Sequence, residues 1–237
     1  MLLAMNEAGE LEEATPGAIA TCPQCSEALR AKCGEIVTWH WAHIAGTDCD
    51  PWAEHETDWH LEWKRHCPQT EVVFARNACV HRADGVTQTG VVVEFQHSPI
   101  SVSDIAEREA FYGRMIWLFD VREPFTRGRL AVWEKNGRKW LEWKHHRSSI
   151  DECKKLVYLD TGVSIVRLGN NFAYGKWGAT ISTREQFSDW LCGNKGPVNI
   201  YEAERLHYGE QQRIWEEKLG LPGLYTGLSQ ALNRLPR

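Results

Sequence analysis

Four residues near the start of the chain have the types and the spacing of a zinc site. Cys22 and Cys25 are separated by two residues, and His40 and His43 repeat that spacing further along. Tetrahedral zinc favours thiolate and imidazole ligands, and a C-x2-C turn allows two sulfurs to converge on one ion. Four protein ligands leave no open position for a substrate, so we predict a structural zinc site rather than a catalytic one.

The ligand set has open alternatives, because the two histidines are closer than the interval of about three to five residues that is usual for zinc ligands. Cys33 or Cys49 could replace one of them. A plainer interpretation is a set of free thiols and partly buried histidines. We favour zinc because the segment from 22 to 50 has little periodic apolar pattern that would otherwise hold it together.

A second group of residues has the chemistry of a hard-cation site. The segment Val91–Phe95 has the composition of a buried strand, yet Glu94 and Gln96 share one of its faces, because side chains alternate along a strand. Asp84 lies upstream, in a polar connection that we interpret as a turn. The carboxylates of Asp84 and Glu94, with the last carbonyl of the strand, could hold Mg²⁺ or Mn²⁺. Such an ion activates water and stabilises charge on a phosphorus under attack.

A helix predicted from about Pro51 to Arg65 adds three more polar side chains. Glu56, His60 and Lys64 recur at intervals of four and therefore share one helix face. We expect Glu56 to complete or adjust the metal shell. We expect His60 and Lys64 to assist with charge or with proton transfer, while Gln96 orients the attacking water.

Each of these signals also has a plainer interpretation. Asp84 could be a turn residue, and the strand face of Glu94 and Gln96 could meet solvent. The polar helix face could likewise be solvated without a further role. Arg82 and Arg108 could contact nucleic-acid phosphates, because a guanidinium matches phosphate geometry bidentately, or they could pair with nearby acids.

The elements that must position these residues alternate between α and β. We predict strands over 71–75, 91–95 and 115–120, with a helix from an N-cap at Ser101 to about Tyr112. The sequence Asn-Gly at 136–137 predicts a type I′ hairpin. Further elements are predicted downstream: a hairpin within 156–168 and helices over 183–191 and 201–219.

Composition sets the limits for these interpretations. The chain has 237 residues, 43% of them hydrophobic and 25% charged, which is ordinary for a folded globular protein. The net charge of −5 provides no global attraction to nucleic acid, so binding would need a local basic patch, for which the cluster from Lys144 to Arg147 is a candidate. No apolar run approaches about 18 residues, and the acidic start is unlike a signal peptide. We therefore expect a cytoplasmic protein with reduced cysteines and no membrane partner.

Together, the order and spacing of these residues resemble the competence protein CoiA-like family, a branch of the PD-(D/E)XK nuclease superfamily. The likeness covers about residues 1–120. It is carried by CPQC, HWAH, HRADG and VVEFQHSPIS, by the helix face Glu56–His60–Lys64, and by Glu71, Arg108 and Tyr112. The resemblance implies a metal-dependent nuclease centre.

The resemblance also implies roles for the site residues. Asp84 matches the acidic residue of the family's first motif, and Glu94 matches the acid of the second. Gln96 stands where the wider superfamily usually has Lys, although the family itself tends to have Gln there. Gln can orient water but contributes no charge, and Lys64 could supply that charge from the helix.

The implied fold class is α/β (α+β), with a restriction-endonuclease-like mixed central sheet flanked by helices. We expect three regions: a zinc-ribbon-like module over 1–50, a nuclease-like core over 51–125, and a β-hairpin and helical extension over 126–237. The extension could belong to the same domain as the core.

The leading interpretation is an Mg²⁺- or Mn²⁺-dependent endonuclease that hydrolyses phosphodiester bonds of DNA, which could be single-stranded. DNA uptake, recombination or defence would be its setting. One alternative is a catalytically inactive module that keeps the fold and binds nucleic acid or protein. Another is an inhibitor of a nucleic-acid enzyme, for which the negative net charge would be suitable.

Overall fold

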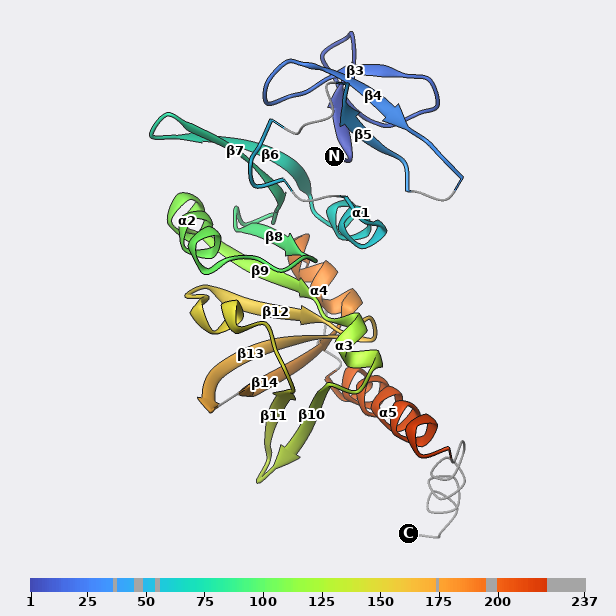
Figure 1. Ribbon diagram of the computed structural model, residues 1–237, viewed down its shortest axis with the longest axis vertical. Coiled ribbons are helices and arrows are strands. Elements are labelled where there is room, and N and C mark those ends of the chain that lie inside the picture. Colours follow the sequence, from blue (N-terminus) through green and yellow to red (C-terminus); the bar gives the residue numbers. More distant parts are fainter. Residues whose placement is uncertain (36–37, 45–48, 54–55, 174, 195–199, 221–237) are drawn as a thin grey trace. The chain divides into compact units, whose positions relative to one another are not determined.

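The structure is a computed structural model, in which the chain forms two compact units (Figure 1). It describes residues 1–35, 38–44, 49–53, 56–173, 175–194 and 200–220, with only the backbone described over 170–173 and 200–205. Unit 1 comprises Met1–Leu118, Glu152–Lys155 and Ser188–Lys195, and unit 2 comprises Phe119–Asp151, Leu156–Phe187 and Gly196–Arg237. The region boundaries expected at 50 and 125 remain predictions. No described helix combines the length and the apolar character that a membrane span requires.

Unit 1 begins with a five-stranded sheet in the order β2-β1-β3-β4-β5. Its short strands are antiparallel wherever their register is defined. Because side chains alternate along each strand, Ala20, Leu29 and Trp41 point to one face and form a small buried core. The indole Nε1 of Trp41 donates to the Glu12 carbonyl at 2.9 Å. The strands are β1 (Leu3–Met5), β2 (Leu11–Glu13), β3 (Ile19–Thr21), β4 (Ala28–Lys32) and β5 (His40–His43).

The rest of unit 1 contains the helices α1 and α2 and four strands of a second sheet (Figure 1). The strand order is β9-β8-β7-β6, and helix α2 connects β8 to β9. Strand β9 is buried along its whole length, as the continuous apolar run MIWLFD predicts. The elements are α1 (Asp58–Arg65), β6 (Gln69–Arg76), β7 (Cys79–Val86), β8 (Val92–Gln96), α2 (Val102–Tyr112) and β9 (Met115–Asp120).

One prediction in this section is wrong: Asp84 does not lie in a turn but on strand β7. The hairpin that joins β6 to β7 turns earlier, at Asn77 and Ala78, whose φ angles are 50° and 64°. Within β7 the polar residues alternate with Ala83 and Gly85, which face inward. The segment therefore has the alternation of a half-buried strand, although its polar composition resembles that of a connection.

The helix ends in unit 1 follow local capping rules. The Ser101 hydroxyl accepts from the Asp104 N–H at 3.1 Å, which confirms the predicted start of α2. Helix α1 begins later than predicted, because Thr57 forms a capping box with His60. The predicted helix face therefore begins with Glu56 just outside the helix.

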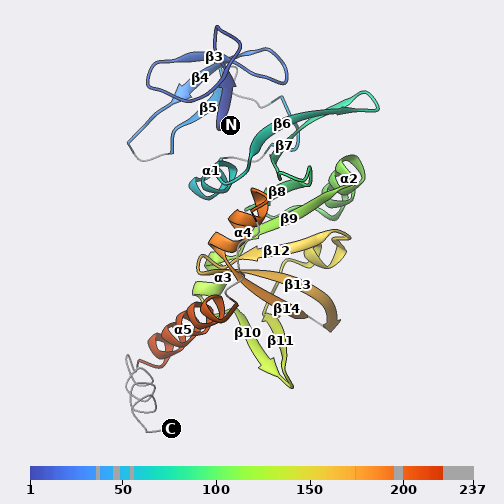
Figure 2. The ribbon, with the colours of Figure 1, turned by 180° about the vertical axis from the view of Figure 1, so that it is seen from behind.

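Unit 2 has the strand order β10-β11-β14-β13-β12. The predicted Asn-Gly hairpin is confirmed, with φ angles of 55° at Asn136 and 70° at Gly137. Helix α5 lies along β14 in this unit, as Figure 2 shows. The elements are α3 (Arg122–Thr126), β10 (Leu130–Lys135), β11 (Arg138–Trp143), η1 (Ser148–Glu152), β12 (Leu156–Asp160), β13 (Ser164–Ala173), β14 (Lys176–Thr183), α4 (Arg184–Leu191) and α5 (Ile200–Leu219). The predicted α+β class, with a mixed sheet, flanking helices and a small N-terminal module, is confirmed.

Candidate metal cluster and acidic site

The N-terminal sheet carries a cluster of four metal-ligating side chains. Ligand atoms of Cys22, Cys25, His43 and Cys49 all lie within 4.8 Å of one another. The two sulfurs of Cys22 and Cys49 are 3.7 Å apart, and Cys25 Sγ is 3.3 Å from His43 Nε2. Sulfurs on one tetrahedral zinc ion, at Zn–S of about 2.3 Å, lie about 3.8 Å apart. The donor set and its spacing therefore fit a Cys₃His site that could hold a metal such as zinc.

His40 does not belong to this cluster, so the ligand set predicted from the sequence needs one correction. His40 and His43 both lie on β5, and an odd separation along a strand places their side chains on opposite faces. The Nδ1 of His40 donates instead to the Thr38 carbonyl at 2.9 Å. Cys49, one of the two alternatives, takes the fourth position, while Cys33 packs against the small core.

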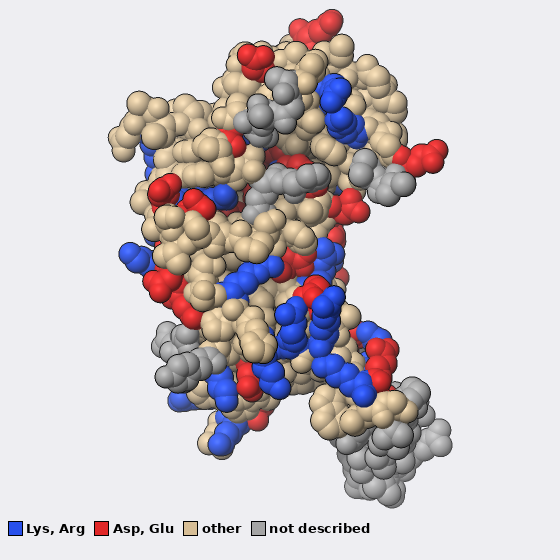
Figure 3. All heavy atoms as spheres, in the orientation of Figure 1, with Lys and Arg blue, Asp and Glu red and all other residues tan. Residues whose placement is uncertain are grey.

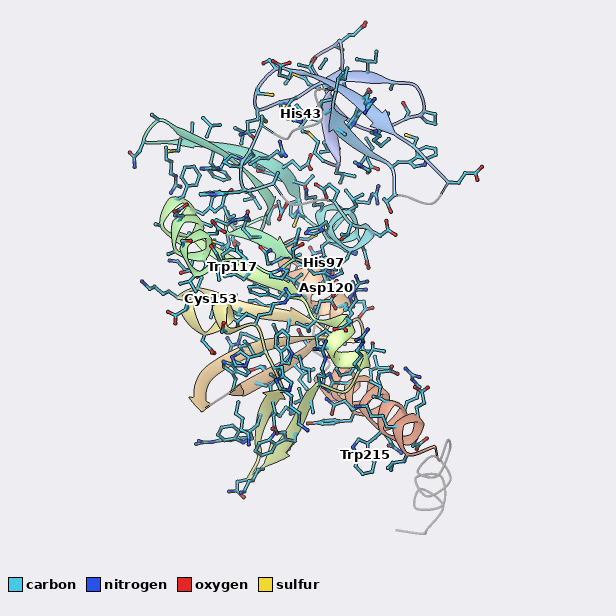
Figure 4. All side chains as sticks on the ribbon, in the orientation of Figure 1. His43, His97, Trp117, Asp120, Cys153 and Trp215 are labelled. Atoms are coloured by element: carbon cyan, nitrogen blue, oxygen red, sulfur yellow. The ribbon has the colours of Figure 1, made fainter. Side chains whose placement is uncertain are left out.

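The turn around Cys22 is built to present sulfur ligands. The Ser26 N–H donates to the Cys22 carbonyl at 2.9 Å, and Ser26 has a φ of 62°. The Gln24 N–H points at Cys22 Sγ, 3.4 Å away, and such a bond stabilises a thiolate. Burial, then hydrogen bonds to Cys25 and Cys22, raise the pKa of Cys49, so a bound cation would have to displace its proton. Figure 4 labels His43 within this module.

The two predicted catalytic acids converge on the adjacent strands β7 and β8. The antiparallel register pairs Gly85 with Val93, so the next residues, Asp84 and Glu94, lie opposite each other. The Asp84 N–H points at Glu94 Oε1 at 3.4 Å, and the Phe95 N–H donates to Asp84 Oδ2 at 3.0 Å. The side chain of Asp84 is 22% exposed, whereas that of Glu94 is buried. The two carboxylates therefore share one face of the sheet.

Lys64 lies at the centre of the acidic site. From helix α1 its Nζ reaches Glu56 Oε1 at 2.5 Å, Glu71 Oε1 at 3.0 Å and Asp84 Oδ1 at 3.2 Å. Burial opposes the charge of Lys64, but the carboxylates of Glu56, Glu71 and Asp84 outweigh it and raise its pKa well above the ordinary value. Burial also opposes ionisation of Glu56, yet the charge of Lys64 prevails and lowers its pKa to about 2. The structure thus places the predicted face of helix α1, through Lys64, against the carboxylate of Asp84.

Glu71 reaches Lys64 through an irregularity in β6. Its neighbours Thr70 and Val72 pair with β7, but Glu71 lies between the pairs with a φ of 55°. The register of the two strands is unbroken there, and the left-handed backbone of Glu71 directs its carboxylate toward Lys64 and toward the backbone N–H groups of Leu2 and Leu3, which donate to it at 2.7 and 2.9 Å. Glu71 therefore links the N-terminal sheet to the acidic site.

Glu94 is held by Arg108, which comes from helix α2. The Nη1 of Arg108 donates to Glu94 Oε2 at 2.7 Å, and its Nη2 donates to the Trp52 carbonyl at 2.7 Å. Burial and the nearby charge of Asp84 raise the pKa of Glu94 to about 7, although Arg108 opposes this shift. Arg108, which the sequence suggested as a phosphate contact, is thus buried and binds protein groups.

His60 and Gln96 differ in how closely they approach the acids. His60 Nε2 donates to the Phe95 carbonyl at 3.0 Å, and its Nδ1 faces the hydroxyl of the N-cap Thr57 at 2.9 Å. The amide of Gln96 donates to the Ser98 carbonyl at 3.0 Å. His60 is therefore fixed beside the backbone of Phe95, one residue from Glu94, whereas the Gln96 amide is directed along its own chain.

The acidic residues surround a cavity of about 20 Å³. Such a volume accommodates about one water molecule or one small ion. Arg82 borders it, and its Nη1 lies 3.4 Å from Gln24 Oε1. Among the described residues, Gln96 does not contribute to the lining. The lining residues are Trp52, Ala53, Glu56, His60, Lys64, Arg82, Asp84, Glu94, Phe95 and Arg108.

Sequence reasoning missed the short segment that follows Cys49. The Asp50 carboxylate is buried and accepts from His81 Nδ1 at 2.9 Å and from the Arg82 N–H at 2.6 Å. The Trp52 ring stacks on His81 with centroids 3.3 Å apart. These contacts join the metal cluster to strand β7, which carries Asp84. In the sequence, the local signal for these contacts is that the acid Asp50 directly follows the candidate ligand Cys49.

Comparisons with known proteins agree with the N-terminal part of this picture. Residues 9–51 match the family model described as competence protein CoiA, N-terminal domain. The match supports the CoiA-like family. The CoiA-like segment includes all four residues of the metal cluster and ends before the acids of β7 and β8. Neither the curated proteins nor the solved structures gave a match.

Proposed function

We propose that this CoiA-like chain is a metal-dependent nuclease that hydrolyses phosphodiester bonds of DNA in a competence-related process. The observation that supports it most strongly is the convergence of Asp84 and Glu94 on one small polar cavity. Carboxylates that meet on rigid neighbouring strands are the usual ligands of a catalytic hard cation. Asp84, Glu94 and the Phe95 carbonyl would hold Mg²⁺ or Mn²⁺. When bound, the ion would lower the pKa of a water molecule and stabilise charge on the phosphate.

The side chains around the acids have distinct tasks in this proposal. Lys64 lies 3.2 Å from Asp84 and supplies the positive charge that Gln96 cannot. His60 orients the Phe95 carbonyl, and Arg108 keeps Glu94 in place. Arg82 borders the cavity and would orient a phosphate. Burial of these groups strengthens their electrostatic interactions relative to water.

A cleavage assay tests the proposal. Single- and double-stranded DNA, with RNA as a third substrate, are incubated with the full chain and Mg²⁺ or Mn²⁺. We expect metal-dependent cleavage that falls by about 100-fold or more in Asp84→Asn and in Glu94→Gln. Glu107→Gln, which removes an exposed acid next to Arg108 on the same helix, is the matched control and should retain activity. Cleavage that survives in both acid variants would contradict the proposal.

A second candidate function is supported by the ion pairs themselves. Lys64 and Arg108 already neutralise the acids from within the chain, which suits a module that binds nucleic acid without cutting it. The same assay separates the two, because such a module would retain DNA and release no fragments with any divalent metal.

A further inference from the structure

We propose that unit 2 carries a nucleotide-binding groove between helix α5 and the β10–β11 hairpin. The groove would hold the phosphate and the base of a nucleotide unit, whether from single-stranded nucleic acid or as a free nucleotide. This proposal concerns binding alone and does not depend on cleavage at the acidic site. Every residue that carries it belongs to unit 2.

One wall of the groove is a single stripe of helix α5. Gln211, Ile214, Trp215 and Lys218 follow the spacing i, i+3, i+4 and i+7, which places them on one face. Ile214 is 5% exposed and anchors this face, whereas Trp215 is 59% exposed. Figure 4 shows Trp215 projecting from α5 on the side of β10 and β11.

The opposite wall is one face of the hairpin. The register pairs Ala131 with Glu142, and the Lys144 N–H donates to the Arg129 carbonyl at 2.8 Å, so Arg129 and Lys144 also lie opposite each other. Residues two apart along a strand share a face, so all four point the same way. The space between the walls measures about 280 Å³, close to the lower end of small-molecule sites. This volume suits one nucleotide unit rather than a duplex.

The charge of the groove is positive. Arg129, Lys144 and Lys218 contribute three cations, and Glu142 contributes the single acid of the lining. Lys176 lies 4.0 Å from Glu142 and offsets its charge. Within the described ranges, no carboxylate lies within 4.0 Å of the ammonium of Lys144 or Lys218, whereas Arg129 pairs with Glu123 outside the groove. Figure 3 shows further Lys and Arg side chains gathered over the neighbouring helix α3.

Proteins bind single-stranded nucleic acid with an exposed aromatic ring beside cationic side chains, and Trp215 lies beside Lys144 and Lys218, which have no ion pair among the described residues. Bases stack on aromatic rings, and the backbone follows positive charge. Glu210 and Glu217 lie on a different face of α5, where both are paired with Arg213. The helix therefore separates an acidic, internally paired face from a basic, aromatic one.

The groove is preformed by buried contacts. The Gln211 amide, in the orientation that satisfies its neighbours, accepts from the Val132 N–H at 2.7 Å and donates to the Val132 carbonyl at 3.1 Å. It also accepts from His207 Nε2 at 3.1 Å, and the hydroxyl of Ser164 donates to His207 Nδ1 at 2.8 Å. A Cβ on Gly128 would lie 2.5 Å from Lys218 Nζ, so a larger residue there would shift the ammonium. Helix α5 is thus fixed against β10 before any ligand arrives.

The test measures binding to the full chain without Mg²⁺ or Mn²⁺, so that cleavage does not interfere. The probes are a fluorescent oligothymidylate, followed by anisotropy, and thymidine monophosphate, followed by tryptophan quenching. Trp215→Ala should weaken oligonucleotide binding about five- to 150-fold, the range found for loss of one stacked base. Lys144→Ala combined with Lys218→Ala should weaken it and reduce the salt dependence by about 1.4 in the logarithmic slope.

The controls are two variants outside the groove. Arg213→Ala removes a cation from the other face of α5, and Trp190→Ala removes an exposed indole from another helix; neither should alter affinity. Binding of the oligonucleotide alone would identify a strand as the ligand, and equal binding of the monophosphate would identify a free nucleotide. Absence of binding, or affinity that is unchanged in the groove variants, would overturn the proposal. Either result leaves the cleavage assay at Asp84 and Glu94 unaffected, so the two proposals can fail separately.

Discussion

Replacement of Lys64 by methionine tests the reasoning about the acidic site most directly. Its ammonium is buried among the carboxylates of Glu56, Glu71 and Asp84. Removing one partner of a buried ion pair costs about 3–5 kcal/mol, because the remaining charge is left unpaired. The lowered pKa of Glu56 provides a second value for the free energy of this interaction. The difference between about 2 and its ordinary 4.5, at about 1.36 kcal/mol for each pH unit, corresponds to about 3 kcal/mol.

The sign of the pH dependence follows from the lowered pKa of Glu56. Its contribution to stability is fully present above pH 4.5 and is lost as the pH falls through 2, because the folded state then has to take up a proton. Lys64→Met removes the main charge that holds this pKa down. We therefore expect a deficit of about 3–5 kcal/mol at pH 7 that becomes small near pH 2.

The measurement is hydrogen exchange of peptides from α1 and β6, recorded at pH 7 and in acid, with β12 and β13 of unit 2 as an internal reference. Arg65→Met is the matched control. Arg65 is the next residue on α1, and its pair with Glu13 is exposed, so we expect a change within about 0.5 kcal/mol. Equal protection in Lys64→Met and wild type at pH 7, or an unchanged acid response, would refute the electrostatic account.

Three further predictions concern other parts of the chain. Cys49→Ser should abolish the binding of one zinc per chain measured by elemental analysis, whereas His40→Gln should retain it; the reverse result would restore the ligand set expected from the sequence. Burial lowers the pKa of His207 to about 4, so unit 2 should lose up to about 3 kcal/mol as the pH falls from 6.5 toward 4, and His207→Gln should remove this loss in urea unfolding curves. Asp50→Ala should cost about 2–4 kcal/mol and reduce exchange protection of β7, because a buried and a half-buried donor lose their acceptor; unaltered protection would show that Asp50 does not anchor this strand.

Elements defined by short-range rules could be predicted from the sequence. Ser101 caps α2, and the Asn-Gly turn at 136–137 needs positive φ at both positions, so each signal lies within a few residues. Asp84 was predicted to lie in a turn because the residues around it are mostly polar, and the alternation of inward and outward side chains along β7 is weak in the sequence. Strand β7 is stabilised by its pairing with β6 and β8, which no local pattern reveals.

In the candidate site, too, features set by neighbouring residues could be predicted from the sequence, whereas contacts between distant residues could not. The pairing of Lys64 with Asp84 spans twenty positions and depends on how α1 meets β7. His40 could have been excluded from the sequence by the alternation rule, once residues 40–43 were taken as a strand. The contact between Trp52 and Arg108 could not, because it joins a turn to a helix through a backbone carbonyl.

The position of the Glu71 carboxylate has a practical consequence for how this protein can be divided into fragments. Its oxygens accept from the backbone of Leu2 and Leu3, and Asp50 holds β7 from the other side of the expected boundary. A fragment that starts at residue 51 would lose both sets of donors and acceptors at once. The small sheet is therefore hydrogen-bonded to the section that carries the acids, and fragments for biochemistry should keep both on the same polypeptide.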